Sequence, residues 1–204
     1  NGKTAGELAE KVLLTDSTNI EAMKIQVNDF VSRKRWNEAY KTSSALIKIK
    51  DIPAECIFTH IDVCLASGKN SEAWDIISSL YEKNPKNEAV LQNYIKVLVA
   101  TDRRSEASQL IEQNLSGASS KMKSFFYYER SFLQKNENAV MVDLRSSLTA
   151  NPRNKDALFR LYQIYFNKKE YRKAQYYLKQ VVAISPADES LLLLNAELET
   201  LLSK

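Results

Sequence analysis

Apolar residues recur along this chain at the spacing of helices that bury one face. Near the start of the chain they fall at Ala5, Ala9 and Val12, and intervals of three and four residues place side chains on the same side of a helix. Thr4 and Glu7 have the spacing of a capping box, in which each side chain accepts a hydrogen bond from the other residue's backbone N–H. The pattern predicts a helix that begins directly after Thr4.

A short motif recurs in the same context at regular intervals. Its versions are Trp36-Asn37-Glu38-Ala39, Asn70-Ser71-Glu72-Ala73, Arg104-Ser105-Glu106-Ala107 and Tyr171-Arg172-Lys173-Ala174. The alanines at 39, 73 and 107 are 34 residues apart, and Val140 follows after 33 residues and Ala174 after 34 more. Glycine and proline occur only four times each, which disfavours strands joined by tight turns. An even period of this length indicates an all-α protein built from repeats.

The period and its residues resemble the tetratricopeptide repeat, which is a pair of antiparallel helices that together span about 34 residues. The match is clearest between Lys155 and Asp188 and extends over almost the whole chain. There the resemblance assigns Leu158, Leu161 and Tyr165 to the first helix, Tyr171 to the turn, Ala174 to the close crossing of the two helices, and Leu178 and Val181 to the second helix. Tyr162 departs from the family, which usually has a small residue at that position. The implied fold is an all-α, right-handed superhelical solenoid of antiparallel helix pairs, with about twelve helices.

This resemblance divides the chain into three parts. Residues 1–19 would hold the second helix of a truncated preceding repeat, and residues 20–188 would hold five repeats that start near residues 20, 54, 88, 121 and 155. Residues 189–204 would form a closing helix, because a stack of repeats must cover its last apolar face. The run from Ser116 to Ser120 leaves open whether a bend or an ordinary loop joins the third and fourth repeats. Since the chain begins at Asn1 without an initiator methionine, we expect a fragment of a longer or processed protein.

Charge and composition exclude several functional classes. The net charge is only +4, with 29 basic and 25 acidic residues interspersed, so no basic stripe predicts nucleic-acid binding. The most apolar run, Leu191 to Leu194, is only four residues long, far shorter than a membrane span. Cys56 and Cys64 lie eight residues apart on one predicted helix, too far along the helix axis for a disulfide. The sequence predicts no compartment.

Residues with catalytic potential are sparse. His60 is the only histidine, and its position on the first helix of a pair favours a place in the core. Cys56, His60 and Cys64 share one helix face, but no fourth ligand is evident among them, so the sequence predicts no metal site. No glycine-rich phosphate loop is present. We therefore expect no enzyme activity, no catalytic residue and no cofactor.

The implied solenoid would present a concave groove formed mainly by the first helix of each pair, where an extended or helical peptide can lie. The groove candidates are Lys24, Asn28, Phe58, Asp62, Gln92, Asn93, Lys96, Phe125, Phe126, Glu129, Phe132, Phe159, Arg160, Gln163 and Phe166. Aromatic candidates concentrate in the C-terminal half, where they would either anchor a ligand or belong to the core between repeats.

The leading hypothesis is therefore a scaffold or adaptor that binds a protein or peptide segment in this groove. Family members that bind the acidic C-termini of heat-shock chaperones carry five polar groove residues, of which only Lys24 and Asn28 are matched here, and this ligand class is excluded. The alternative is a self-assembly module that forms a homo-oligomer through the leucine-rich C-terminal helix, whose leucines are Leu191, Leu192, Leu193, Leu194, Leu198, Leu201 and Leu202.

Overall fold

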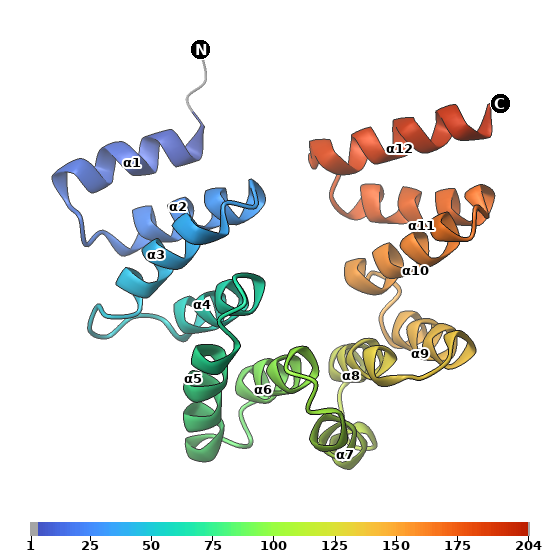
Figure 1. Ribbon diagram of the computed structural model, residues 1–204, viewed down its shortest axis with the longest axis horizontal. Coiled ribbons are helices and arrows are strands. Elements are labelled where there is room, and N and C mark those ends of the chain that lie inside the picture. Colours follow the sequence, from blue (N-terminus) through green and yellow to red (C-terminus); the bar gives the residue numbers. More distant parts are fainter. Residues whose placement is uncertain (1–3, 204) are drawn as a thin grey trace. The chain divides into compact units, whose positions relative to one another are not determined.

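The computed structural model describes residues 4–203, which form twelve helices and no strand (Figure 1). The helices are α1 (Ala5–Thr15), α2 (Ile20–Ser32), α3 (Trp36–Leu46), α4 (Ala54–Ala66), α5 (Asn70–Lys83), α6 (Glu88–Ala100), α7 (Arg104–Leu115), α8 (Ser120–Leu133), α9 (Glu137–Ala150), α10 (Lys155–Asn167), α11 (Tyr171–Ile184) and α12 (Glu189–Leu202). The predicted all-helical class and the expected helix number are confirmed. No helix within residues 4–203 combines the length and the apolar character needed to cross a membrane.

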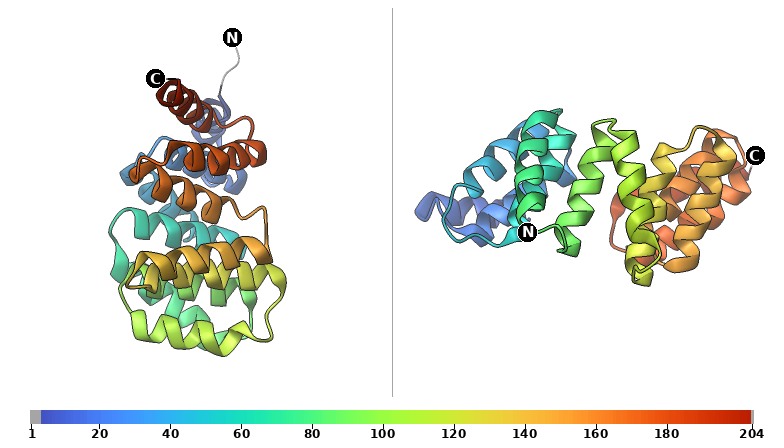
Figure 2. Two further views of the ribbon diagram at one scale, coloured as in Figure 1. Left: turned by 90° about the vertical axis from the view of Figure 1, so that its right-hand side faces the viewer. Right: turned by 90° about the horizontal axis from the view of Figure 1, so that it is seen from below.

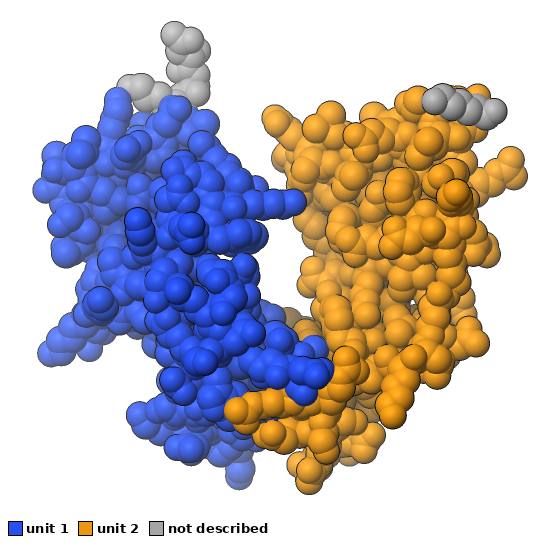
Figure 3. Space-filling view, in the orientation of Figure 1, with its two compact units in different colours: residues 1–102 blue, residues 103–204 orange. Residues whose placement is uncertain are grey.

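The chain divides into two compact units, residues 1–102 and 103–204 (Figure 3). Unit 1 contains α1 to α6 and unit 2 contains α7 to α12. Within each unit, helices that follow one another in sequence pack side by side, for example α2 with α3 and α10 with α11 (Figure 2). The division falls between Asp102 and Arg103, inside the third predicted repeat, and not at the run 116–120.

The N-terminal helix begins as its capping box predicts. The backbone N–H of Glu7 donates to Oγ1 of Thr4 at 3.3 Å, and the backbone N–H of Thr4 donates to Oε2 of Glu7 at 3.2 Å. These two bonds satisfy donors that the first turn of a helix leaves unpaired. Ala9 is buried in α1, whereas Val12 remains 41% exposed.

The loops inside four helix pairs share one backbone conformation. A residue with positive φ occupies the same place in each loop, namely Lys34, Gly68, Asp102 and Lys169, with φ of 56°, 72°, 59° and 60°. In the first of these loops, the backbone N–H of Lys34 donates to the carbonyl of Val31 at 3.0 Å, and that of Arg35 donates to the carbonyl of Phe30 at 2.8 Å. This arrangement closes a helix through a left-handed residue. The α8–α9 loop differs, because Gln134 is extended, with ψ of 142°.

Close packing of helix pairs depends on the recurring small residues. Within the two units, Ala39, Ala73 and Ala174 are completely buried in the pairs α2–α3, α4–α5 and α10–α11, and Val140, which follows the same spacing, is half-buried. Ala73 belongs to a buried cluster in unit 1 and Ala174 to the main buried cluster of unit 2. A methyl group therefore fills each of these sites, and a larger side chain would displace its neighbours.

Ala174→Leu is expected to lower the free energy of unfolding by about 1–3 kcal/mol, because three additional heavy atoms must enter a closely packed site. Ala73→Leu should have the same effect in unit 1. Ala183→Leu is the matched control, since Ala183 is exposed on the same helix, α11, as Ala174. Urea unfolding measures all three variants, and equal stability of Ala174→Leu and Ala183→Leu would show that the crossing position is assigned wrongly.

Candidate functional site

Charged residues link neighbouring first helices in unit 1. Nζ of Lys24 in α2 lies 2.7 Å from Oε1 of Glu55 in α4 and 3.0 Å from Oε1 of Glu21. On the next pair, Nζ of Lys96 in α6 lies 2.8 Å from Oδ1 of Asp62 in α4. The hydrogen bonds to Glu55 and Glu21 raise the pKa of Lys24. Three groove candidates, Lys24, Asp62 and Lys96, are therefore already engaged in ion pairs with groups of the same chain.

A pocket of about 250 Å³ lies between α2 and α4. Lys24, Asn28, Glu55 and Thr59 supply its polar lining, and Val27, Leu46 and Cys56 supply its buried apolar floor. Lys24 already contacts two carboxylates, those of Glu21 and Glu55, so the local charge is negative. An acidic ligand would meet repulsion in this pocket.

The remaining unit 1 candidates differ in exposure. Phe58 is half-buried and lines a second pocket of about 250 Å³, where α4, α5 and α6 meet. Gln92 is also half-buried. Asn93 was predicted to face the groove, but it is only 8% exposed, because it lies on one buried stripe of α6 with Val90 and Val97, three residues before and four after it. Its Nδ2 donates to the carbonyl of Ala89 at 2.8 Å. Asn93 therefore belongs to the interior of unit 1.

In unit 2, an arginine of α10 lies against an aromatic ring of α8. The Arg160 guanidinium carbon is 3.6 Å from the ring centroid of Phe132, and Phe132 is 39% exposed. Nη1 of Arg160 donates to Oγ of Ser131 at 2.5 Å, and Nη2 donates to the Ser131 carbonyl at 3.4 Å. Burial lowers the pKa of Arg160. The hydrogen bonds and the ring contact hold this cation in one orientation beside an exposed aromatic side chain.

Further aromatic rings continue along α10. The Tyr162 ring centroid lies 5.4 Å from that of Phe159 and 5.7 Å from that of Phe166. Phe159 and Phe166 are half-buried and pack against the main buried cluster of unit 2, and Gln163 between them is exposed. Phe125 in α8 is also half-buried. Phe159 and Phe166 therefore contribute both to the core and to the surface of unit 2.

Two candidates on α8 are buried. Phe126 is 1% exposed and Glu129 is 6% exposed, although both were predicted to face the groove. The reason is the register of α8, since its buried face follows Met122, Phe126 and Glu129 at intervals of four and three residues. Phe125 and Phe126 are adjacent in sequence, and only Phe125 retains an exposed edge.

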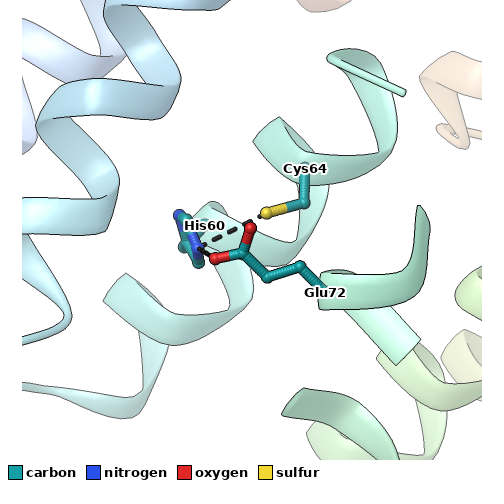
Figure 4. A group of neighbouring side chains, drawn as sticks. All are labelled: His60, Cys64 and Glu72. Carbon is teal, nitrogen blue, oxygen red and sulfur yellow. Dashed lines mark hydrogen bonds and ion pairs between the residues drawn. The ribbon is translucent and has the colours of Figure 1, made fainter. Parts of the chain in front are cut away.

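A polar cluster connects three helices inside unit 1. His60 is completely buried, as expected, and its Nε2 lies 3.2 Å from Oε1 of Glu72 and 3.4 Å from Sγ of Cys64 (Figure 4). Nδ1 of His60 lies 2.8 Å from Oγ of Ser43, and the Tyr40 hydroxyl donates to Oε2 of Glu72 at 2.7 Å. The Tyr40 hydrogen bond lowers the pKa of Glu72, and burial raises the pKa of the Cys64 thiol to about 12.

Sequence reasoning identified two members of this cluster and missed the third. His60 and Cys64 share α4, whereas Glu72 lies in the first turn of α5. Cys56, which was considered with them, instead lines the pocket between α2 and α4. The available signal was the motif Asn70-Ser71-Glu72-Ala73, because Ala73 is completely buried in one cluster with Cys64 of α4 and Glu72 directly precedes it.

Comparison with known proteins bears on the fold. No family model matches the sequence, and no curated protein matches it significantly. A tetratricopeptide repeat protein from Parabacteroides merdae aligns structurally with a TM-score of 0.70 at 12% sequence identity, over 94% of this chain and 75% of that protein. A fragment of MamA from Desulfovibrio magneticus RS-1, from residue 41 to its end, matches at a TM-score of 0.47 and 11% identity, over 91% of this chain and 97% of that fragment. The first of these matches, together with the helix pairs, shows that the chain has the tetratricopeptide-repeat fold.

Proposed function

We propose that the protein is a non-enzymatic adaptor that binds a segment of another polypeptide. The binding surface is the first-helix face of unit 2, by which we mean the face of α8 and α10 that carries Phe132 and Arg160. Repeat proteins with this fold act through the surfaces that their helices present. The observation that carries the proposal is the Phe132–Arg160 pair, in which a ring that is 39% exposed lies 3.6 Å from an oriented guanidinium. Half-buried aromatic side chains of α10 extend this surface.

Energetic reasoning supports the choice of this pair. Aromatic and arginine side chains dominate the binding energy of many protein interfaces. Aromatic side chains bury a large area for a small loss of rotamer freedom, whereas an arginine contributes most when its orientation is already fixed. Arg160 is already held by Ser131 and by the ring of Phe132, so a ligand does not have to order it. An exposed ring beside a cation suits a segment in which an apolar side chain lies next to a carboxylate or a carbonyl group.

A displayed peptide library selected on the wild-type chain tests this proposal. Phe132→Ala is expected to lower the affinity of the selected peptides by at least about tenfold, because it removes an aromatic anchor of the interface. Tyr176→Ala is the matched control, since Tyr176 is an aromatic residue that is 64% exposed on the second helix α11. Peptides that bind both variants as tightly as they bind the wild-type chain would place the recognition surface elsewhere.

Self-assembly is the second candidate function, and the exposure of α12 favours it. Leu191 and Leu198 are buried against the main cluster of unit 2, but Leu192, Leu193 and Leu201 are 46%, 67% and 37% exposed. Light scattering on the wild-type chain and on Leu193→Lys separates the two functions. A dimer that this substitution dissociates would support self-assembly, whereas a monomer at high concentration would exclude it.

A further inference from the structure

Three potential metal ligands converge in unit 1. Nε2 of His60, Sγ of Cys64 and a carboxylate oxygen of Glu72 all lie within 4.8 Å of one another, and within residues 4–203 this is the one group of histidine, cysteine and carboxylate side chains that converges in this way. The three side chains point toward one another from α4 and the start of α5 (Figure 4). We propose that His60, Cys64 and Glu72 bind a divalent cation of the zinc type.

The spacing of the ligand atoms fits a tetrahedral ion. Zinc bonds of about 2.0–2.1 Å to nitrogen, 2.0–2.2 Å to oxygen and 2.3 Å to sulfur place neighbouring tetrahedral ligands about 3.4 Å apart for nitrogen and oxygen and about 3.6 Å apart for nitrogen and sulfur. The observed separations are 3.2 Å between His60 and Glu72 and 3.4 Å between His60 and Cys64. These two pairs need shifts of only about 0.2 Å. The third pair, Sγ of Cys64 and the Glu72 carboxylate oxygen, lies within 4.8 Å against about 3.6 Å in a tetrahedral site, so rotation of the half-exposed Glu72 side chain has to bring its oxygen up to about 1.2 Å closer to the thiol.

Two residues of α3 orient these ligands. Oγ of Ser43 donates to the carbonyl of Tyr40 at 3.2 Å, so it can accept a hydrogen bond from Nδ1–H of His60, which lies 2.8 Å away. That tautomer leaves the lone pair of Nε2 directed toward Cys64 and Glu72. The Tyr40 hydroxyl donates to Oε2 of Glu72 and leaves Oε1 on the side of His60. Metal-binding histidines and carboxylates are oriented by hydrogen bonds of this kind.

Charge balance favours the same class of ion. A divalent cation with one thiolate, one carboxylate and one neutral imidazole forms a neutral group, which reduces the cost of placing charge next to the completely buried His60 and Cys64. The positive charge of Lys69 acts to lower the pKa of both Glu72 and Cys64. The same charge repels a cation and so weakens the attraction of this cluster for a metal ion. A nitrogen, a sulfur and an oxygen ligand together suit zinc, whereas magnesium and calcium prefer oxygen ligands alone.

Glu72 provides the route to solvent. Its side chain is 36% exposed, whereas that of His60 is completely buried. Three protein ligands with one open position are typical of zinc sites in which water or a partner group supplies the fourth ligand. A bound ion would join α4 to α5 directly and α3 through Tyr40 and Ser43, so that binding of the metal stabilises unit 1.

Titration of the reduced, metal-free full chain with cobalt(II), a spectroscopic substitute for zinc, tests the proposal. We expect one cobalt ion per chain, a near-ultraviolet charge-transfer band from a cobalt–thiolate bond, and loss of the band when zinc is added. Cys64→Ala should abolish the band. Cys56→Ala should retain it with unchanged affinity, because Cys56 is the only other cysteine and lies outside the cluster.

Two further variants distinguish a loss of metal binding at this site from unfolding of the chain. Glu72→Gln preserves the size of a half-exposed side chain and should weaken zinc binding at least tenfold, and Tyr40→Phe, which removes only the orienting hydroxyl, should weaken it about 10–100-fold. Circular dichroism verifies that both variants are folded. Absence of the cobalt–thiolate band in the wild-type chain, a band retained by Cys64→Ala, or unchanged zinc affinity of Glu72→Gln would each overturn the proposal.

Discussion

Phe126→Ala is expected to lower the free energy of unfolding by about 3–5 kcal/mol, which is the range for removing a fully buried aromatic side chain. Phe126 is 1% exposed and is one of the largest completely buried side chains among the described residues. Its removal leaves a cavity in unit 2 that neighbouring residues cannot fill without moving. Chemical unfolding monitored by circular dichroism measures the effect.

Phe132→Ala is the matched control for this prediction. Both phenylalanines lie on α8, but Phe132 is 39% exposed, so its loss should lower the free energy of unfolding by less than about half as much. The two variants should also differ in function, since Phe132 belongs to the proposed binding surface and Phe126 to the core. Equal destabilisation by the two substitutions would contradict the register described for α8.

Arg130→Ala is expected to destabilise unit 2 by about 2–4 kcal/mol, near the lower part of the range for breaking a buried ion pair, because Asp143 is buried but the Arg130 side chain is 26% exposed. Asp143 in α9 has a side chain that is only 2% exposed, and Nη2 of Arg130 lies 2.6 Å from its Oδ1. Nε of Arg130 donates to the same carboxylate, and Nε2 of Gln134 donates to Oδ2 at 2.5 Å. The hydrogen bond to Asp143 raises the pKa of Arg130. Without the guanidinium, a buried carboxylate is left without its cation.

The double variant Arg130→Met/Asp143→Leu distinguishes this explanation from simple loss of packing. Replacing both charges by apolar side chains removes the uncompensated charge, so most of the stability should return. Arg35→Ala is a matched single-site control, because the Arg35–Glu38 pair is exposed, with side-chain exposures of 48% and 40%, and exposed pairs contribute about 0–1 kcal/mol. Equal effects of Arg130→Ala and Arg35→Ala on thermal unfolding would contradict the account.

The repeat was predictable because it depends on spacing that the sequence records directly. The alanines at 39, 73, 107 and 174 mark a period near 34 residues, and all four are completely buried. The residues with positive φ in the loops follow the same period. Only Gly68 among them is of a residue type that readily adopts positive φ and so predicts it from the sequence. After Lys34 and Lys169 the following residue bonds back to the helix, since the N–H of Arg35 donates to the carbonyl of Phe30 at 2.8 Å and that of Glu170 to the carbonyl of Tyr165 at 2.9 Å.

The candidate surface was predictable only in part. A helix period places a residue on a face with an error of about one position, and Phe125 and Phe126 show the consequence, since one retains an exposed edge and the other is buried. Asn93 is a second example, since it falls on a buried stripe of α6 with Val90 and Val97. The contact of Arg160 with Ser131 joins residues far apart in the chain, and no local pattern encodes such a pairing.

The polar cluster has a similar explanation. Its members come from α3, α4 and α5, and the hydrogen bonds from Tyr40 and Ser43 to Glu72 and His60 depend on how these helices pack. Spacing along one helix identified Cys56 instead of Glu72 as the companion of His60. The division of the chain at Asp102 was also not predicted, because the sequence marks this loop with the same pattern as the other pairs.

The central claim is that a polypeptide segment binds to the first-helix face of unit 2 through Phe132 and Arg160. Its most direct test is to titrate an isotope-labelled chain with a selected peptide and to follow the backbone and side-chain resonances by nuclear magnetic resonance. The account predicts that the largest shifts occur at Phe132, at the Arg160 guanidinium and at the adjoining Ser131. Shifts confined to α11 around Tyr176, with Phe132 and Arg160 unperturbed, would contradict it.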